Sequence, residues 1–267
     1  MPADLIGTAG ARRALAVTNE ALFVNPAGVA MAPVYSVELG YGDDFRGSDR
    51  RFHVSITDGQ AGPIAGGLSF TYTTARPRDS TDDSERLEGF RVDGAVALRA
   101  NQALALGFGV RGTVYDLETD DESTDESQGT LTFDFGLQWR ISEFLVLGLV
   151  GRNLTNPDEA ETPLEAGGGL GVINGPFSIE VDAYYDNFLK NVVIASGSTY
   201  VINRLIPVRL GSLYDAAQNE FGISGGLGIQ YGRVGLDIGY QQRVRNADDS
   251  RDDDERIFTV NAFLQPF

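Results

Sequence analysis

The feature that most constrains the fold is a period of two in the hydrophobic pattern, which recurs along almost the whole chain. In residues 131–141 the odd positions are Leu, Phe, Phe, Leu, Trp and Ile, and the even positions are Thr, Asp, Gly, Gln and Arg. Such alternation is typical of a β-strand whose two faces meet different surroundings. The clearest segments are 103–115, 131–141, 177–182 and 233–241, and weaker ones are 35–41, 52–58, 64–74, 90–99, 143–153, 163–173, 191–201, 205–214, 221–231 and 257–267.

These are about fourteen segments of about ten residues, the length of a tilted strand that crosses a bilayer. A soluble β-sandwich also alternates, but its outer face is fully solvated. Here the second face is mostly Gly, Ala, Ser and Thr with an occasional charge, which suits the narrow interior of a barrel. The chain has 33 glycines and no run of the roughly 18 apolar residues that a transmembrane helix needs. We therefore predict an all-β fold, a transmembrane antiparallel β-barrel.

Acidic residues gather in four segments, 42–50, 76–88, 116–129 and 245–256, and the net charge is −17. Long and short connections alternate between the predicted strands, and all four acidic segments fall among the long ones. In a barrel this places them together at one end. A surface of this charge repels nucleic acid. We interpret the acidic segments as solvated loops, with divalent-cation binding by the clusters at 120–122 and 252–254 as the alternative.

The segment before the first predicted strand, residues 12–33, contains Asn25-Pro26-Ala27-Gly28. It resembles the N-terminal region of the FadL-type transporters of hydrophobic compounds and of the related PorV-type outer-membrane proteins, in which an Asn-Pro-Ala motif directly precedes the first strand. Residues 205–215 and 221–242 are similar to the closing strands of the same families, where an Arg-Leu-Gly strand precedes a glycine-rich hairpin.

The resemblance implies that residues 1–33 form a plug inside the lumen, with Asn25-Pro26-Ala27-Gly28 as its motif, and that residues 34–267 form the barrel. It also implies a bacterial outer membrane, with periplasmic termini, extracellular acidic loops, and lipid and lipopolysaccharide as surroundings. Two features depart from the FadL pattern: the long loops are acidic rather than partly apolar, and the chain is short.

Charges of both signs lie on predicted inward faces, and we expect them to form ion pairs because a charge in a narrow lumen must be paired or hydrated. Catalysis by the carboxylates Glu180 and Asp182, or by His53 beside Ser55, is the alternative that we disfavour. The Gly-x-Gly-x-x-Gly pattern at 107–112 lies on an alternating strand and not at the start of a helix, so it does not predict a nucleotide site. We expect no enzymatic activity, no cofactor and no metal site. The predicted luminal charges are Arg91, Asp93, Arg111, Asp134, Arg140, Asp182, Arg209, Arg233 and Asp237.

Two functions remain open. A FadL-like barrel passes small hydrophobic compounds, which would be its ligands. A PorV-like barrel anchors a multiprotein envelope complex for secretion, surface attachment or motility, with other envelope proteins as its partners. The N-terminal motif favours the first function, and an apolar passage inside the barrel would support it. A lumen filled by ion pairs would support the second.

Overall fold

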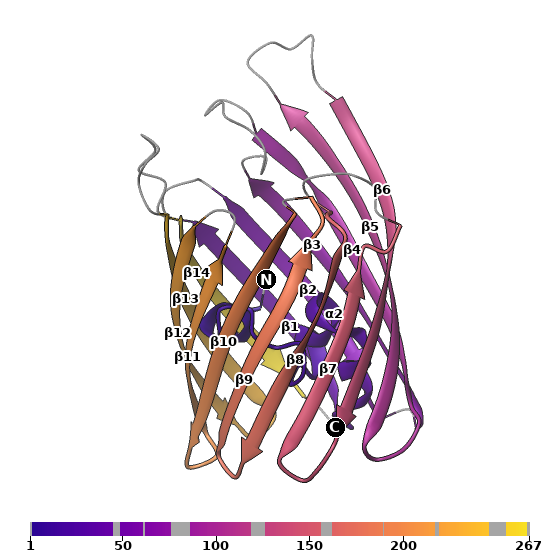
Figure 1. Ribbon diagram of the computed structural model, residues 1–267, viewed down its shortest axis with the longest axis vertical. Helices are drawn as coiled ribbons and strands as arrows, with labels where there is room; N and C mark the ends of the chain where they lie inside the picture. The colour runs from indigo at the N-terminus through magenta and orange to yellow at the C-terminus, as the bar shows by residue number, and fades with distance from the viewer. Residues whose placement is uncertain are drawn as a thin grey trace.

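The computed structural model describes residues 2–44, 49–60, 62–75, 86–118, 126–155, 162–188, 190–216, 219–245 and 255–265. Its fourteen strands form one closed antiparallel barrel, in which strands adjacent in sequence pair and β1 pairs with β14 (Figure 1). This confirms the predicted all-β antiparallel barrel. The strands are β1 (Tyr35–Asp44), β2 (Arg50–Asp58), β3 (Ile64–Ala75), β4 (Arg86–Arg99), β5 (Leu104–Glu118), β6 (Glu126–Arg140), β7 (Leu145–Arg152), β8 (Glu165–Asn174), β9 (Phe177–Asp186), β10 (Asn191–Ile202), β11 (Ile206–Asp215), β12 (Glu220–Tyr231), β13 (Val234–Arg245) and β14 (Glu255–Leu264).

The alternation in the sequence becomes the two faces of the barrel wall. Along β12 the large side chains at odd positions, from Phe221 to Tyr231, are exposed, whereas Gly222, Ser224 and Gly228 are buried. The same pattern holds on β9, where Val181 is exposed and Asp182 is fully buried. Closure of the sheet through β1 and β14 leaves no edge strand, so the ladders satisfy the backbone of the wall without water.

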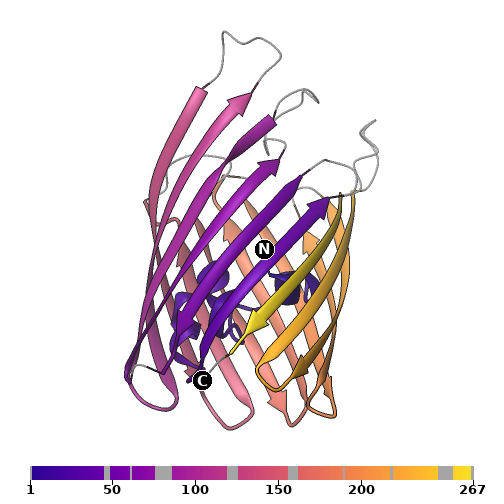
Figure 2. The same ribbon diagram turned by 180° about the vertical axis from the view of Figure 1, so that it is seen from behind.

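The short connections lie at one end of the barrel, the lower end in Figures 1 and 2. Two residues, Gly175 and Pro176, join β8 to β9, and Gly232 and Arg233 join β12 to β13. Gly175 and Gly232 have φ angles of 59° and 62°. Two-residue hairpin turns require such angles, which glycine adopts without a steric penalty.

The wall is tallest at β5 and β6, which rise above their neighbours in Figure 1. Their pairing continues as far as Leu117 and Glu126. The predicted acidic loop 116–129 is therefore too long, since the hydrogen-bonded ladder extends into a region where the hydrophobic alternation has ended. β7 has only 8 residues and pairs with β6 only over 135–140.

Residues 2–33, here called the N-terminal segment, lie inside the barrel (Figures 1 and 2). Helix α1 (Ala3–Gly7) contacts β11 to β14, α2 (Thr18–Val24) contacts β1 to β4, and the 3-10 helix η1 (Pro26–Ala30) contacts β3 to β6. Among the described residues, no helix is long and apolar enough to cross a membrane.

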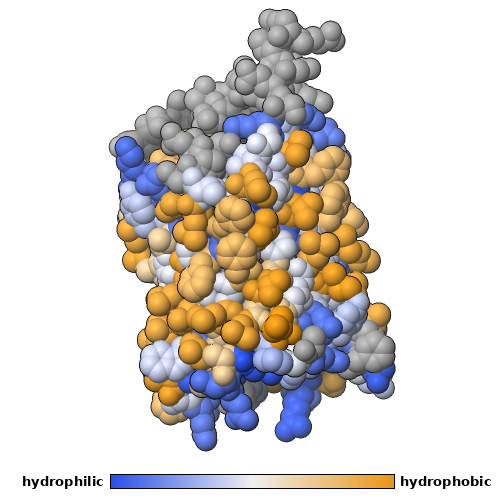
Figure 3. Space-filling view, turned by 90° about the vertical axis from the view of Figure 1, so that its right-hand side faces the viewer, coloured by the Kyte–Doolittle hydropathy of each residue, from blue (hydrophilic) through white to orange (hydrophobic). Residues whose placement is uncertain are grey.

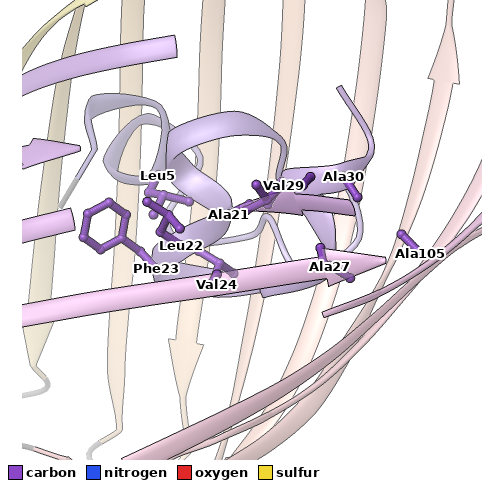
Figure 4. Packing of buried hydrophobic residues seen from close by; sticks show 13 residues of the cluster. Leu5, Ala21, Leu22, Phe23, Val24, Ala27, Val29, Ala30 and Ala105 are labelled. Atoms are coloured by element: carbon purple, nitrogen blue, oxygen red, sulfur yellow. The ribbon is translucent and has the colours of Figure 1, made fainter. Parts of the chain in front are cut away.

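The main hydrophobic core lies between this segment and the inner wall. Leu22, Phe23 and Val24 of α2 join Ala27 and Val29 of η1, and the wall contributes only alanines to the cluster (Figure 4). Glycines on the strands bring the backbone of the segment close to the wall. A Cβ atom at position 107 would lie 2.2 Å from the backbone nitrogen at 27, and one at position 136 would lie 2.1 Å from the Oδ1 of residue 25.

Candidate functional site in the barrel interior

The outer wall carries an apolar band, which Figure 3 shows as a broad zone of hydrophobic side chains with hydrophilic groups at the lower end. Phe221 and Tyr231 are exposed near the two ends of β12. With a rise of about 3.3 Å per residue and a tilt of about 40°, they lie about 25 Å apart along the barrel axis. That height equals the apolar band of outer-membrane barrels, about 25 Å.

Two carboxylates of β9 bind the N-terminal segment through four successive backbone N–H groups. The Oδ2 atom of Asp182 accepts hydrogen bonds from the nitrogens of Arg12 at 2.9 Å and Arg13 at 3.0 Å. Glu180 accepts from the nitrogen of Ala14 and, at 3.1 Å, from that of Leu15. Both carboxylates are buried, with exposed fractions of 2% and 0% for Glu180 and Asp182. Charge-assisted hydrogen bonds of this kind are about twice as strong as neutral ones. We call this arrangement the carboxylate cradle.

Asn25 joins the two halves of the segment to each other and to the wall. Its amide nitrogen donates to the carbonyl of Arg13 at 2.7 Å and to that of Leu137, on β6, at 3.2 Å. Its Oδ1 atom accepts from the nitrogen of Ala27 at 3.2 Å, which caps η1. Pro26 occupies the first position of η1, where a missing N–H costs nothing. Asn25, Pro26, Ala27 and Gly28 are all buried against the wall or against the segment itself.

Other strands hold further carbonyls of the segment. Gln138 of β6 donates to Ala14 and Ala16, and Arg99 of β4 donates from Nε to Ala30 at 2.6 Å. The hydroxyl of Ser224, on β12, donates to the carbonyl of Gly7 at 3.1 Å. The segment is thus attached to opposite sides of the barrel.

Inside the segment, Arg12 and Glu20 form a bidentate ion pair, with Nε donating to Oε2 at 2.9 Å. Burial raises the pKa of Glu20 to about 8, assisted by the carboxylate of Asp4 and opposed by Arg12. Burial also acts to raise the pKa of Asp4, but a hydrogen bond with Glu20 and the positive charges of Arg209 and Arg12 outweigh it and lower that pKa. The pKa of Glu20 therefore lies well above that of Asp4.

The predicted luminal charges meet mainly at Arg111. Its guanidinium donates to Asp93 at 2.7 Å, to Asp134 at 3.0 Å and to the side-chain oxygen of Asn153 at 2.7 Å. Arg91 completes the group with an ion pair to Asp93 at 2.9 Å. Asn153 has a φ of 53° and donates its own N–H to Asp134, so this polar residue at the end of β7 belongs to the network. The alternation pattern gives no signal for it.

The remaining predicted luminal residues divide into two groups. Arg209 pairs with Asp237 at 2.6 Å beneath α1, and Asp182 lies in the carboxylate cradle. Arg140 and Arg233 are exposed at the short-turn end, outside the ion-pair network. Period two assigns a face but does not show where a strand ends, so the pattern did not place these two arginines at the end of the barrel.

His53 is buried on the inner wall, where its Nε2 lies 2.9 Å from Glu38 and its ring packs edge-on against Phe23. Ser55 accepts a hydrogen bond from Asn19 of α2 at 2.9 Å. Both side chains hold the N-terminal segment. In the described part of the chain, no group of three or more His, Asp or Glu side chains is arranged to hold a metal ion. The acidic clusters at 120–122 and 252–254 lie outside the described residues.

One side of the interior is apolar. Val193 and Ala195 of β10 pack with Leu213 of β11 and with the partly buried ring of Tyr184. The segment covers the aliphatic part of this patch with two small side chains, Ala9 and Ala11, and the guanidinium of Arg13 lies 3.7 Å from the centroid of the Tyr184 ring. We call this surface the apolar wall patch: Tyr184, Val193, Ala195 and Leu213.

Solved structures with the same architecture are known. The monoaromatic hydrocarbon channel CymD matches with a TM-score of 0.74 and 10% identity over 98% of this chain and 97% of its own. A Pseudomonas aeruginosa FadL homologue matches with a TM-score of 0.70 and 13% identity over 99% of both chains. The chain has the fold of the FadL-type channels. The P. putida toluene transporter TodX matches with a TM-score of 0.71 and 12% identity over 99% of this chain and 97% of that one.

No protein-family model matches the sequence, and no curated protein matches it. The likeness to FadL-type barrels therefore lies in the backbone and covers nearly the whole of each chain. These structures lend no support to the PorV-like alternative.

Proposed function

We propose that the protein is an outer-membrane channel that passes small hydrophobic compounds, with residues 1–33 as its plug and residues 34–267 as its transmembrane barrel. The observation that carries the proposal is the full-length likeness to CymD and TodX, a monoaromatic hydrocarbon channel and a toluene transporter. The apolar outer band supports the membrane location, because an exposed apolar surface of this extent belongs in lipid. The short turns and both termini would be periplasmic, and the acidic loops extracellular.

We assign the plug role to the N-terminal segment because its attachments reach β2, β4, β6, β9 and β12. The Asn25-Pro26-Ala27-Gly28 motif would fix its shape, since Asn25 links Arg13, Leu137 and Ala27. The ion pairs of Arg111 with Asp93 and Asp134 would stiffen the wall at β4, β5 and β6.

We assign ligand contact to the apolar wall patch. Val193, Ala195 and Leu213 offer an apolar surface on a luminal wall that also carries ion pairs. Ala9 and Ala11 cover it with little side-chain volume, so a small movement of the plug would expose it to a hydrophobic solute.

Uptake of radiolabelled toluene by cells that express the protein tests the proposal. We expect faster uptake than in cells that express a double variant, Val193→Asp with Leu213→Asp, because carboxylates make the patch polar. The matched control is Val192→Ala, which changes the exposed neighbour on the outer face. Equal uptake with and without the protein, at equal amounts in the outer membrane, would refute transport of this substrate class.

The plug role has its own test. Deleting residues 1–24 should leave a barrel that still inserts, because the strand ladders satisfy its backbone. In a liposome-swelling assay the truncated barrel should admit small solutes faster than the full chain. A truncated protein that inserts and leaks no more than the full chain would show that the segment occludes nothing.

A further inference from the structure

Exposed arginines recur at the short-turn end of the barrel. Four consecutive short turns join β6 to β7, β8 to β9, β10 to β11 and β12 to β13. Three of them carry an arginine: Arg140 at the end of β6, Arg204 between β10 and β11, and Arg233 between β12 and β13. All three are exposed. We call this set the basic rim.

The positive charge of the basic rim is not neutralised by any residue in the described part of the chain. Within the described ranges, none of its three guanidinium groups forms an ion pair with a carboxylate. Two of them lie beyond the strand ends, because Arg204 belongs to the turn between β10 and β11 and Arg233 to the two-residue turn between β12 and β13. Exposed guanidinium groups without an ion pair are available to anions from outside the chain.

Exposed aromatic side chains lie just above the basic rim on the same strands. Trp139 precedes Arg140 on β6 and is 45% exposed, and Tyr231 ends β12 and is 77% exposed. Tyr200 is exposed near the end of β10. Aromatic girdles mark the boundary between hydrocarbon and headgroups in outer-membrane barrels. Arginines one to four positions beyond such a girdle therefore stand at the level of the lipid phosphates.

We propose that the basic rim binds the headgroups of anionic phospholipids in the leaflet at the short-turn end. The chemistry fits, because a guanidinium presents parallel N–H donors that match a phosphate in a bidentate way. A phosphodiester without a compensating ammonium group is preferred, since the rim supplies the positive charge. The binding surface lies at the short-turn rim of the barrel, at the strand ends and in the turns beyond them. It rests on the membrane location in the proposed function.

The single tryptophan of the chain gives a local probe, because Trp139 adjoins Arg140. The full-length protein is reconstituted in phosphatidylcholine with increasing fractions of brominated phosphatidylglycerol, and quenching of Trp139 is recorded. The parallel series uses brominated phosphatidylcholine in phosphatidylglycerol. One arginine near an anionic surface contributes about 1 kcal/mol, so we expect phosphatidylglycerol to be preferred about fivefold at this position. The preference should fall in 1 M salt, where the Debye length is about 3 Å.

Arg140→Gln should remove most of the preference, and Arg140→Lys should keep part of it because the charge remains. Arg50→Gln is the matched control, since it removes an exposed arginine from the opposite end of the barrel and should change nothing. Equal quenching by the two brominated lipids in the unsubstituted protein, or an unchanged preference in Arg140→Gln, would overturn the proposal. If the protein were not embedded in the membrane, neither brominated lipid would quench Trp139, and this result would refute the proposed membrane location instead.

Discussion

Removing one carboxylate of the cradle should release residues 12–15 while the barrel stays closed. Asp182→Ala deletes the acceptor of the Arg12 and Arg13 backbone N–H groups, both of which lie within the barrel interior. A buried donor left without an acceptor costs about 1–3 kcal/mol, so the two together cost about 2–6 kcal/mol. The same free energy is removed from the docked state of the N-terminal segment.

Hydrogen–deuterium exchange of the backbone amides measures this cost directly. Since 1.4 kcal/mol corresponds to a factor of ten, the lower limit of about 2 kcal/mol predicts about thirtyfold faster exchange at residues 12–15. The strand amides of β9 should keep their protection, because their ladders to β8 and β10 do not involve the side chain of Asp182.

Asp182→Asn retains one acceptor oxygen and should accelerate exchange much less than Asp182→Ala. Val181→Ala changes the outward neighbour on β9 and serves as the control. The reasoning fails if Asp182→Ala leaves exchange at residues 12–15 within a factor of three of the unsubstituted protein. It also fails if Val181→Ala accelerates exchange there as strongly.

Three further predictions concern the outer wall, the packing of the N-terminal segment against the inner wall, and the titration of Glu20. Phe135→Arg places a charge on the outward-facing side of β6. Near the bilayer midplane such a charge should destabilise the inserted barrel by about 2–4 kcal/mol. The folded yield in lipid, compared with that of Phe135→Leu, measures the effect. Gly136→Ala adds a Cβ 2.1 Å from the Oδ1 of Asn25, so the N-terminal segment should dock poorly and solute leakage in the swelling assay should rise. Gly112→Ala is the control, because a Cβ there meets no atom within 4 Å and should leave the leakage unchanged. The pKa of Glu20 is raised to about 8 from an ordinary value near 4.5, so its contribution to docking is present at low pH and is lost as pH rises through 8. Leakage should therefore increase as the pH rises from about 4.5 to about 8, and Glu20→Gln should flatten that rise. A pH profile that the substitution leaves unchanged would remove Glu20 from the explanation.

The barrel could be predicted from the sequence because each strand carries its own evidence. Period two requires only neighbouring residues, and the bilayer sets strand length. The inward or outward direction of Phe135 and Asp134 follows from the same pattern. The ends of the strands could not be predicted as well, since β5 continues to Glu118 after its alternation has ended.

The interior was predictable in kind but not in its contacts. Asp93, Arg111 and Asp134 were expected inside with partners of opposite charge, and they form such pairs. The carboxylates Glu180 and Asp182 were expected in ion pairs, but their principal partners are backbone N–H groups of residues 12–15, with a longer contact from Arg13 to Asp182 at 3.4 Å. Backbone donors have no signature in a sequence, and the contact joins positions far apart in the chain. The role of Asn25 came from a family resemblance and not from the pattern of the residues around it.

The closure of the barrel between β1 and β14 sets the order in which the molecule can assemble. Every strand precedes or follows its partner directly in the chain except at this seam, which joins the first strand to the last and carries the largest loop-closure entropy. The N-terminal segment contacts strands on all sides of the enclosed space, so its attachments cannot be complete until the sheet has curled around it. Interactions that form after the rate-limiting step leave the folding rate almost unchanged and slow unfolding instead. We therefore expect the buried polar contacts of the segment to slow the unfolding of the closed barrel more than they speed its formation.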